Sequence, residues 1–175
     1  MDRNDMNLQS DLEQTRLPID IKVDAMDARE KEVEKLCCWA AARAAAVVII
    51  PGLGTVALIA NEVYLVKKIG ALYGQELSES VVLGFIASLG ATVIGGTLAT
   101  LVPYSPTKIV IGAGLSYGVG KAASEWLKAG RPDDVGVFKE VFSSARDQVK
   151  NNIQKYINNP DKDKPLGDES QEFKL

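Results

Sequence analysis

Residues 47–60 read VVIIPGLGTVALIA, a stretch whose glycine spacing could bind a nucleotide phosphate. Gly52-x-Gly54-x-x-Ala57 fits the dinucleotide-binding turn, in which glycines let the backbone approach a pyrophosphate at the start of a helix. The same letters describe a hydrophobic segment that is bent at Pro51-Gly52, as in a membrane hairpin. The first interpretation predicts an oxidoreductase, and the second predicts a membrane protein with no chemistry of its own.

A second glycine pattern lies at 108–120, where KIVIGAGLSYGVG places Gly114, Gly118 and Gly120 after a short Ile/Val run. Its local order of strand, glycines and helix matches the Rossmann pattern better than the first. The surrounding sequence supports neither pattern. A doubly wound sheet needs several strands and helices in alternation, and the chain shows no such alternation. The sequence also has no GxxxxGK[ST] motif. We therefore expect no nucleotide or other cofactor.

The remaining reactive side chains predict neither a catalytic nor a metal site. The chain has no histidine, which excludes His-dependent triads, imidazole bases and most zinc sites. Cys37 and Cys38 are neighbours and cannot close a useful loop, so we expect buried thiols, with acylation at a membrane edge as the alternative. Glu76 and Glu79 could form an acid/base pair, but acids near a helix start more often stabilise the helix N-terminus.

Glu62 is the acid that stands out, because it lies inside an apolar helix. An ionisable group in such a segment of a membrane protein is by default a functional hypothesis. The alternatives are a structural position beside Tyr64 and Lys67 near a membrane interface, or an ion pair with Lys121. Glu62 and Lys121 are therefore the candidate polar groups within a membrane.

Charge is distributed unevenly along the chain. The net charge is -3, so there is no overall basic footprint, and we expect no nucleic-acid partner. Charged residues crowd into 1–35 and 128–175, whereas residues 80–102, SVVLGFIASLGATVIGGTLATLV, form a 23-residue run without a charge. About 20 apolar residues suffice to cross a bilayer core, and glycine is common in transmembrane helices. This run favours a membrane protein.

The patterns predict an all-α protein built of glycine/alanine-rich helical hairpins, inserted in or associated with a membrane, with flanking amphipathic helices. Residues 1–26 are polar and largely disordered in this interpretation, apart from a strand-like IDIKV at 19–23. Residues 27–130 form the hairpin domain, 131–158 an amphipathic helix with apolar residues at three- and four-residue spacing, and 159–175 a disordered tail. The N-terminus has no hydrophobic region of a signal peptide, so we do not expect secretion.

Two sets of small residues are expected to shape the hairpins. Breaks at the turns should return Arg43 and Lys67-Lys68 to one face, which places both termini on the cytoplasmic side. The membrane turns comprise Pro51, Gly52, Gly54, Pro103 and Pro106. Small residues at every fourth position form rails that let helices pack closely, on each other or in an oligomer. These rails comprise Ala87, Ala91, Gly95 and Ala99 in the first arm and Gly114, Gly118 and Ala122 in the second.

Two spaced motifs resemble the YcjF-like, GTPase-associated domain of unknown function. Ile50, Pro51 and Gly54 match the I-P-x-x-G turn of that family. The family's I-G-x-x-Y-G motif is matched by Ile69, Gly70, Tyr73 and Gly74, and an apolar pair of helices follows; the likeness covers roughly 36–130. The resemblance implies an α-helical, membrane-associated module that works with a GTPase or by self-assembly. This chain carries no GTPase domain, so the GTPase would be a separate partner.

The sequence thus predicts a non-enzymatic, membrane-associated helical protein that oligomerises, shapes the membrane or recruits a partner such as a GTPase. Its expected partners are a lipid membrane, a second copy and a GTPase. The first alternative is a pore or transport component that uses Glu62 and Lys121. The second alternative is a soluble all-α interaction module.

Overall fold

In the computed structural model, residues 28–50, 54–89, 106–158 and 167 are described, and the regular elements among them are all helical. These elements are a helix at 28–47, α2 (Gly54–Leu72), α3 (Glu79–Ser88), α5 (Pro106–Lys128), the 3-10 helix η1 (Val135–Phe138), α6 (Lys139–Asn151) and α7 (Ile153–Ile157). No strand occurs among the described residues, which confirms the all-α prediction. The strand-like residues 19–23 lie outside them.

The chain divides into two compact units, Met1–Glu32 and Val33–Leu175. The described part of the first unit, residues 28–32, is the first turn of the helix at 28–47. All contacts discussed below belong to the second unit. The predicted domain bounds, 27–130 and 131–158, stay predictions.

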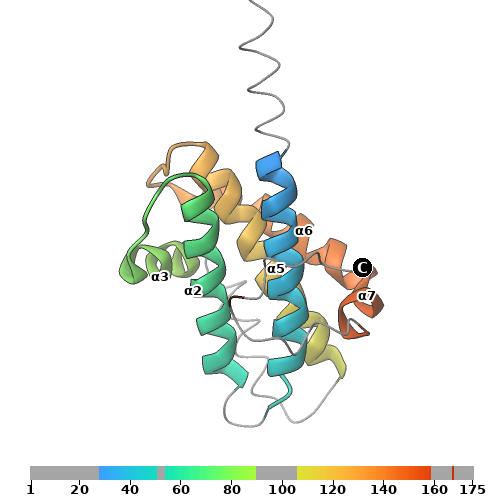
Figure 1. The fold of residues 1–175 in the computed structure, drawn as a ribbon. Helices are drawn as coiled ribbons and strands as arrows, with labels where there is room; N and C mark the ends of the chain where they lie inside the picture. The colour runs from blue at the N-terminus through green and yellow to red at the C-terminus, as the bar shows by residue number, and fades with distance from the viewer. Residues whose placement is uncertain (1–27, 51–53, 90–105, 159–166, 168–175) are drawn as a thin grey trace, which may run out of the picture. The chain divides into compact units, whose positions relative to one another are not determined.

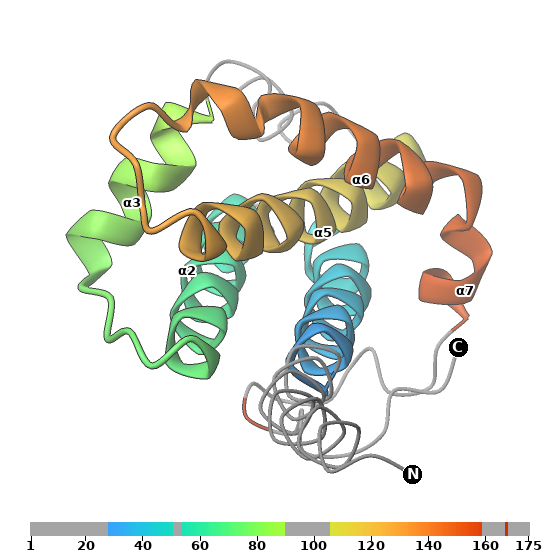
Figure 2. The same cartoon turned by 90° about the horizontal axis from the view of Figure 1, so that it is seen from above.

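Helix α5 lies at the centre of the second unit. Every residue from 112 to 120 is buried. Figure 2 shows α6 on one side of α5, and the pair formed by α2 and the helix at 28–47 on the other. A helix that is buried all round needs small residues wherever a neighbour approaches closely. The glycines of α5 meet this need.

Four glycines of α5 face backbone or side-chain atoms that would crowd an added Cβ. A Cβ on Gly118 would lie 2.8 Å from the carbonyl oxygen of Phe142, and one on Gly114 would lie 2.9 Å from Cγ of Arg146. On another side of α5, a Cβ on Gly112 would lie 3.1 Å from Cβ of Val48, and one on Gly120 would lie 2.5 Å from Sγ of Cys37. Close helix packing therefore explains the second glycine pattern without any ligand.

The small residues predicted to form the rail of the second arm pack against other parts of the same chain. Gly114 and Gly118 lie against α6, and Ala122 is fully buried. In the first arm, Ala87 is exposed on α3, whereas Ala91, Gly95 and Ala99 lie outside the described residues. Packing of the two rails on each other therefore stays a prediction.

The contacts fix the relative directions of the helices. Asn61 of α2 bonds Ser116 of α5, and Tyr73, just past the end of α2, bonds Ser124, so α2 and α5 run parallel. The helix at 28–47 runs antiparallel to both, since Val48, just past its end, meets Gly112 near the start of α5 (Figure 1). Helix α6 also runs antiparallel to α5.

The I-G-x-x-Y-G motif forms the end of α2. Gly70 approaches Leu77 so closely that a Cβ would lie 2.9 Å from its side chain. The N–H of Gln75 donates to the carbonyl oxygen of Gly70 at 2.9 Å, and Gly74 takes the left-handed conformation with φ 69°. This is the helix termination that glycine favours. The glycines of the motif thus end α2 and allow the chain to reverse direction.

The predicted turn residues are only partly within the described chain. Gly54 begins α2, and its N–H donates to the carbonyl oxygen of Ile50 at 3.0 Å. A Cβ there would lie 2.9 Å from the carbonyl oxygen of Val48, so the turn requires glycine. Pro106 is the first residue of α5, where its missing N–H costs nothing. Pro51, Gly52 and Pro103 lie outside the described residues.

The predicted amphipathic helix at the C-terminus is interrupted. It consists of η1, α6 and α7, and Asn152, with φ -121° and ψ 21°, separates the last two. Its apolar face, with Phe142, Ala145 and Val149 buried, packs on α5. The partner of this apolar face is therefore the chain itself.

Length and hydropathy together decide whether a helix can cross a bilayer. Among residues 28–50, 54–89 and 106–158, no helix has both the length and the mean hydropathy that a membrane span requires.

Replacing Gly118 by alanine should destabilise the fold, because its Cβ would meet the backbone of Phe142. Overpacking of this kind costs about 1–3 kcal/mol. Gly84 is the matched control: it lies inside α3, and a Cβ added there would have no atom within 4 Å, so Gly84→Ala should gain up to about 1 kcal/mol of helix propensity. Denaturant unfolding followed by circular dichroism checks both changes. Equal stabilities for the two variants would contradict the packing described for α5.

Candidate functional site

Exposed aliphatic side chains gather around the turn between the helix at 28–47 and α2. Of the six large apolar side chains exposed in the described part of the chain, four belong to this turn. They are Ile49, Ile50, Val56 and Ile59, which are 38%, 44%, 68% and 39% exposed. We call these four residues the apolar turn. Such a concentration of exposed aliphatic side chains marks an interaction surface more often than isolated exposed residues do.

The apolar turn is held by buried neighbours. Val48 is 2% exposed and Leu58 is fully buried, so each arm of the turn is anchored in the core. Val56 and Ile59 are three residues apart in α2 and therefore lie on one face of the helix. The described residues on either side of the turn are thus anchored in the core.

The surface of the apolar turn is free of exposed acids. Between Arg43 and Lys67 the only acidic or basic residue is Glu62, which is buried. Lys108 is half-buried and precedes Gly112 by one turn of α5, at the end of α5 that meets Val48. This end of α5 therefore carries a cation.

Further from the apolar turn, polar side chains connect the helix at 28–47, α2 and α5. The Nδ2 group of Asn61 donates to the carbonyl oxygen of Ala40 at 3.0 Å and to Oγ of Ser116 at 3.2 Å. The Nε group of Arg43 donates to Oδ1 of Asn61 at 3.2 Å. The guanidinium of Arg43 also lies 6.0 Å from the ring of Tyr64. Arg43, Asn61 and Ser116 thus form a buried polar layer.

Glu62 is adjacent to this layer and is 1% exposed. Neither of its carboxyl oxygens has a hydrogen-bond partner among the described residues. Burial raises the pKa of Glu62 from its ordinary value of 4.5 to about 8. A carboxyl group in this environment is mostly protonated at neutral pH. Glu62 does not pair with Lys121, which bonds Glu34 instead.

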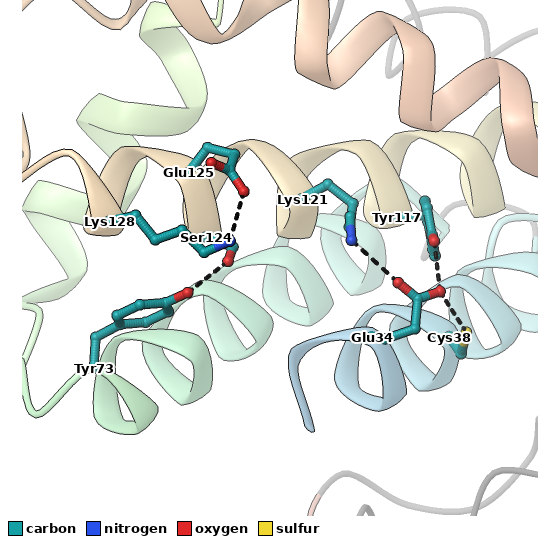
Figure 3. Close-up of polar contacts among 8 residues, drawn as sticks. All are labelled: Glu34, Cys38, Tyr73, Tyr117, Lys121, Ser124, Glu125 and Lys128. Carbon is teal, nitrogen blue, oxygen red and sulfur yellow. Dashed lines mark hydrogen bonds and ion pairs between the residues drawn. The ribbon is translucent and has the colours of Figure 1, made fainter. Parts of the chain in front are cut away.

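Glu34 is the centre of a second polar group that the sequence did not reveal (Figure 3). Tyr117 donates its hydroxyl to Oε1 of Glu34 at 2.6 Å, and Lys121 donates to Oε2 at 3.2 Å. Cys38 donates to Oε1 at 3.6 Å, and the ring of Tyr156 lies edge-on to that of Tyr117 at 6.5 Å. This Glu34 cluster joins the helix at 28–47 to α5 and α7. Only the fold brings its members together, since Glu34 and Tyr117 are far apart in sequence.

The two cysteines are buried, as expected. Burial, reinforced by the charge of Glu34, raises the pKa of Cys38 to about 12 and that of Cys37 well above its usual range. Both thiols are therefore protonated at neutral pH, and a thiolate nucleophile is disfavoured at either position. Burial and the hydrogen bond to Glu34 also raise the pKa of Tyr117.

The other acids considered from the sequence lie at a helix start. Glu79 is in the first turn of α3, and Oγ of the N-cap residue Ser78 accepts a hydrogen bond from the N–H of Val81 at 3.4 Å. Glu76 is exposed in the preceding loop. This arrangement supports capping. The described residues contain no group of three side chains suited to hold a metal ion.

Comparison with known proteins gives one similarity of note. No family model and no solved structure matches the chain. Over 79 residues the chain is 37% identical to a protein named Magnetosome membrane protein 22 from Magnetospirillum gryphiswaldense. The match covers 45% of this chain and only 40% of that relative's length.

The stability of the fold should depend on pH through Glu62. Because the pKa of Glu62 is raised to about 8, the folded state keeps a proton that the unfolded state loses above pH 4.5. The free energy of unfolding therefore falls between these two pH values. Glu62→Gln should be about 3 kcal/mol more stable than the unmodified protein at pH 7 and equally stable at pH 4. Denaturant titrations at both pH values measure the difference; the same gain at pH 4 and pH 7 would contradict a titrating Glu62.

Proposed function

We propose that this chain is a non-enzymatic, membrane-associated helical protein that attaches to a lipid bilayer through the apolar turn. The carrying observation is the group of four exposed aliphatic side chains at that turn, with no exposed acid among them. Burial of aliphatic surface in the boundary of a bilayer is favourable by roughly 25 cal/mol per Å². An exposed acid at the same place would oppose it.

Three further observations support a lipid surface as the partner. The apolar turn lies at one end of the helix pair, where the chain reverses, so both arms can approach a surface together. Lys108, at the end of α5 that meets Val48, would favour anionic headgroups. The name of the similar protein from Magnetospirillum gryphiswaldense describes that protein as a membrane protein. The mode we propose is attachment at the surface by the described helices, with both termini on the cytoplasmic side.

The same proposal includes assembly at the membrane. Exposure of Ala87 on α3 leaves this residue of the first rail open to contact with a second copy. A GTPase is the partner that the resemblance to the YcjF-like domain implies. Transport through a pore has weaker support, because Lys121 is held by Glu34 and Glu62 is enclosed in the core.

Flotation with liposomes tests the proposal. Val56 and Val137 are matched valines, 68% and 63% exposed, but Val137 lies in η1, outside the apolar turn. Val56→Asp should reduce the lipid-bound fraction about tenfold or more, because it removes aliphatic area and adds a charge that must be desolvated. Val137→Asp should bind as the unmodified protein does.

Equal binding by both variants would mean that the lipid contact lies outside the apolar turn. Absence of binding by the unmodified protein, with vesicles of zwitterionic and of anionic lipid alike, would overturn membrane attachment and favour the soluble interaction module.

A further inference from the structure

Glu62 lies in the face of α2 that packs against α5. Leu58, Leu65 and Ile69 flank it at helical spacing, and each is at most 1% exposed. A Cβ on Gly120 of α5 would lie 2.9 Å from Cδ2 of Leu65, so this face and α5 are in close contact. The carboxyl group therefore interrupts an otherwise apolar face of α2.

The charged and titratable groups of the neighbouring elements are engaged elsewhere. Arg43 bonds Asn61, and Lys121 and Tyr117 bond Glu34. Cys37 is a buried thiol. On α2 itself, Lys67 and Lys68 are exposed, and Glu79 of the packed helix α3 is exposed as well. Burial alone accounts for the raised pKa of Glu62, with no contribution from any of these charges.

The closed packing of α2 on α5 therefore accepts Glu62 only in its neutral form. A carboxylate without a hydrogen-bond partner in an apolar interface must be solvated, paired or moved. Separation of α2 from α5 would give the carboxylate access to water. Such a motion would bring Leu58 and Leu65 to the surface beside Val56 and Ile59.

We propose that Glu62 is a proton-controlled switch: loss of its proton separates α2 from α5 and enlarges the apolar surface at the turn. Protons favour the closed form, because only the closed form holds the carboxyl group protonated near neutral pH. The part of this inference that concerns lipid rests on the proposed function; the opening itself does not.

Cys37 and Cys38 report on the opening without lipid. Cys37 lies beneath α2, since its Sγ and Leu65 both crowd Gly120, whereas Cys38 is on the side of Glu34 and Tyr156. Opening of α2 should uncover Cys37 and leave Cys38 covered. Cys38→Ser leaves Cys37 as the single thiol, and Cys37→Ser leaves Cys38 as the control for global unfolding.

The rate of alkylation by iodoacetamide is measured for each single-thiol protein, with Glu62 and with Glu62→Gln, from pH 6 to pH 9. The ratio of the two rates at one pH cancels the ionisation of the thiol. For Cys37 this ratio should rise on the order of tenfold to a hundredfold and level off above pH 8. For Cys38 the ratio should rise much less. Glu62→Met, which also cannot ionise, should behave as Glu62→Gln does.

Two results would overturn the switch. A constant ratio for Cys37 would mean that the ionised carboxyl group finds a partner inside the closed fold, for instance Arg43. An equal rise for Cys37 and Cys38 would mean that ionisation favours global unfolding.

Flotation with phosphatidylcholine vesicles at pH 6 and pH 9 tests the link to lipid. The bound fraction should rise with pH for the unmodified protein and stay constant for Glu62→Gln. A rise in both proteins, or in neither, would overturn the link even if alkylation of Cys37 shows the opening. Absence of binding at both pH values, with vesicles of anionic lipid as well, would instead contradict the proposed function.

Discussion

The structure depends on how closely three neighbours approach α5. The helix at 28–47 with the turn that follows it, α2 and α6 each lie so close to a glycine on α5 that a Cβ there would be crowded. Close approach multiplies van der Waals contacts, each small, into a large sum. Glycine weakens an isolated helix by about 1 kcal/mol per residue, and the packing of α5 on all sides offsets that loss. The same glycines that suggest a nucleotide loop or a membrane rail are thus accounted for by protein packing.

Polar groups inside this packing define its register. Asn61 contacts the backbone of one helix and a side chain of another, so a shift of α2 by one turn would break several hydrogen bonds at once. Apolar contacts tolerate such a shift far better, because they have no direction. Glu62 has no comparable bonds among the described residues and adds nothing to the register. Its presence in the core lowers stability at neutral pH, which is the kind of local cost that proteins keep at functional positions.

The sequence predicted the class of fold and much of the helix content, because strong apolar periodicity survives without knowledge of the neighbours. The all-α prediction is confirmed. The sequence does not show where α2 ends: the helix continues past Lys67-Lys68 to Leu72, since Ile69 is buried and the glycine that stops it is Gly74. Within the amphipathic segment predicted at 131–158, periodicity does not reveal the break at Asn152.

For the site, the sequence identified Glu62 through its contrast with apolar neighbours. It missed Glu34, because nothing near Glu34 reveals that Tyr117 and Lys121 will face it. It also missed that Gly114 and Gly118 contact α6. A row of small residues indicates that another segment packs closely, but it does not identify that segment. The apolar turn was predicted as a turn from Gly54, whereas the exposure of Ile50 and Val56 depends on how the arms pack.

The contacts of Glu34 have a consequence for synthesis of the chain. Its partners Tyr117 and Lys121 follow it by 83 and 87 residues. At about 5–20 residues per second, a ribosome takes roughly 4–17 s to add that length. During this interval α2 is the packing partner already made for the helix at 28–47, since Asn61 bonds the backbone of Ala40. The face of that helix that carries Glu34 acquires its partners only when α5 has been made.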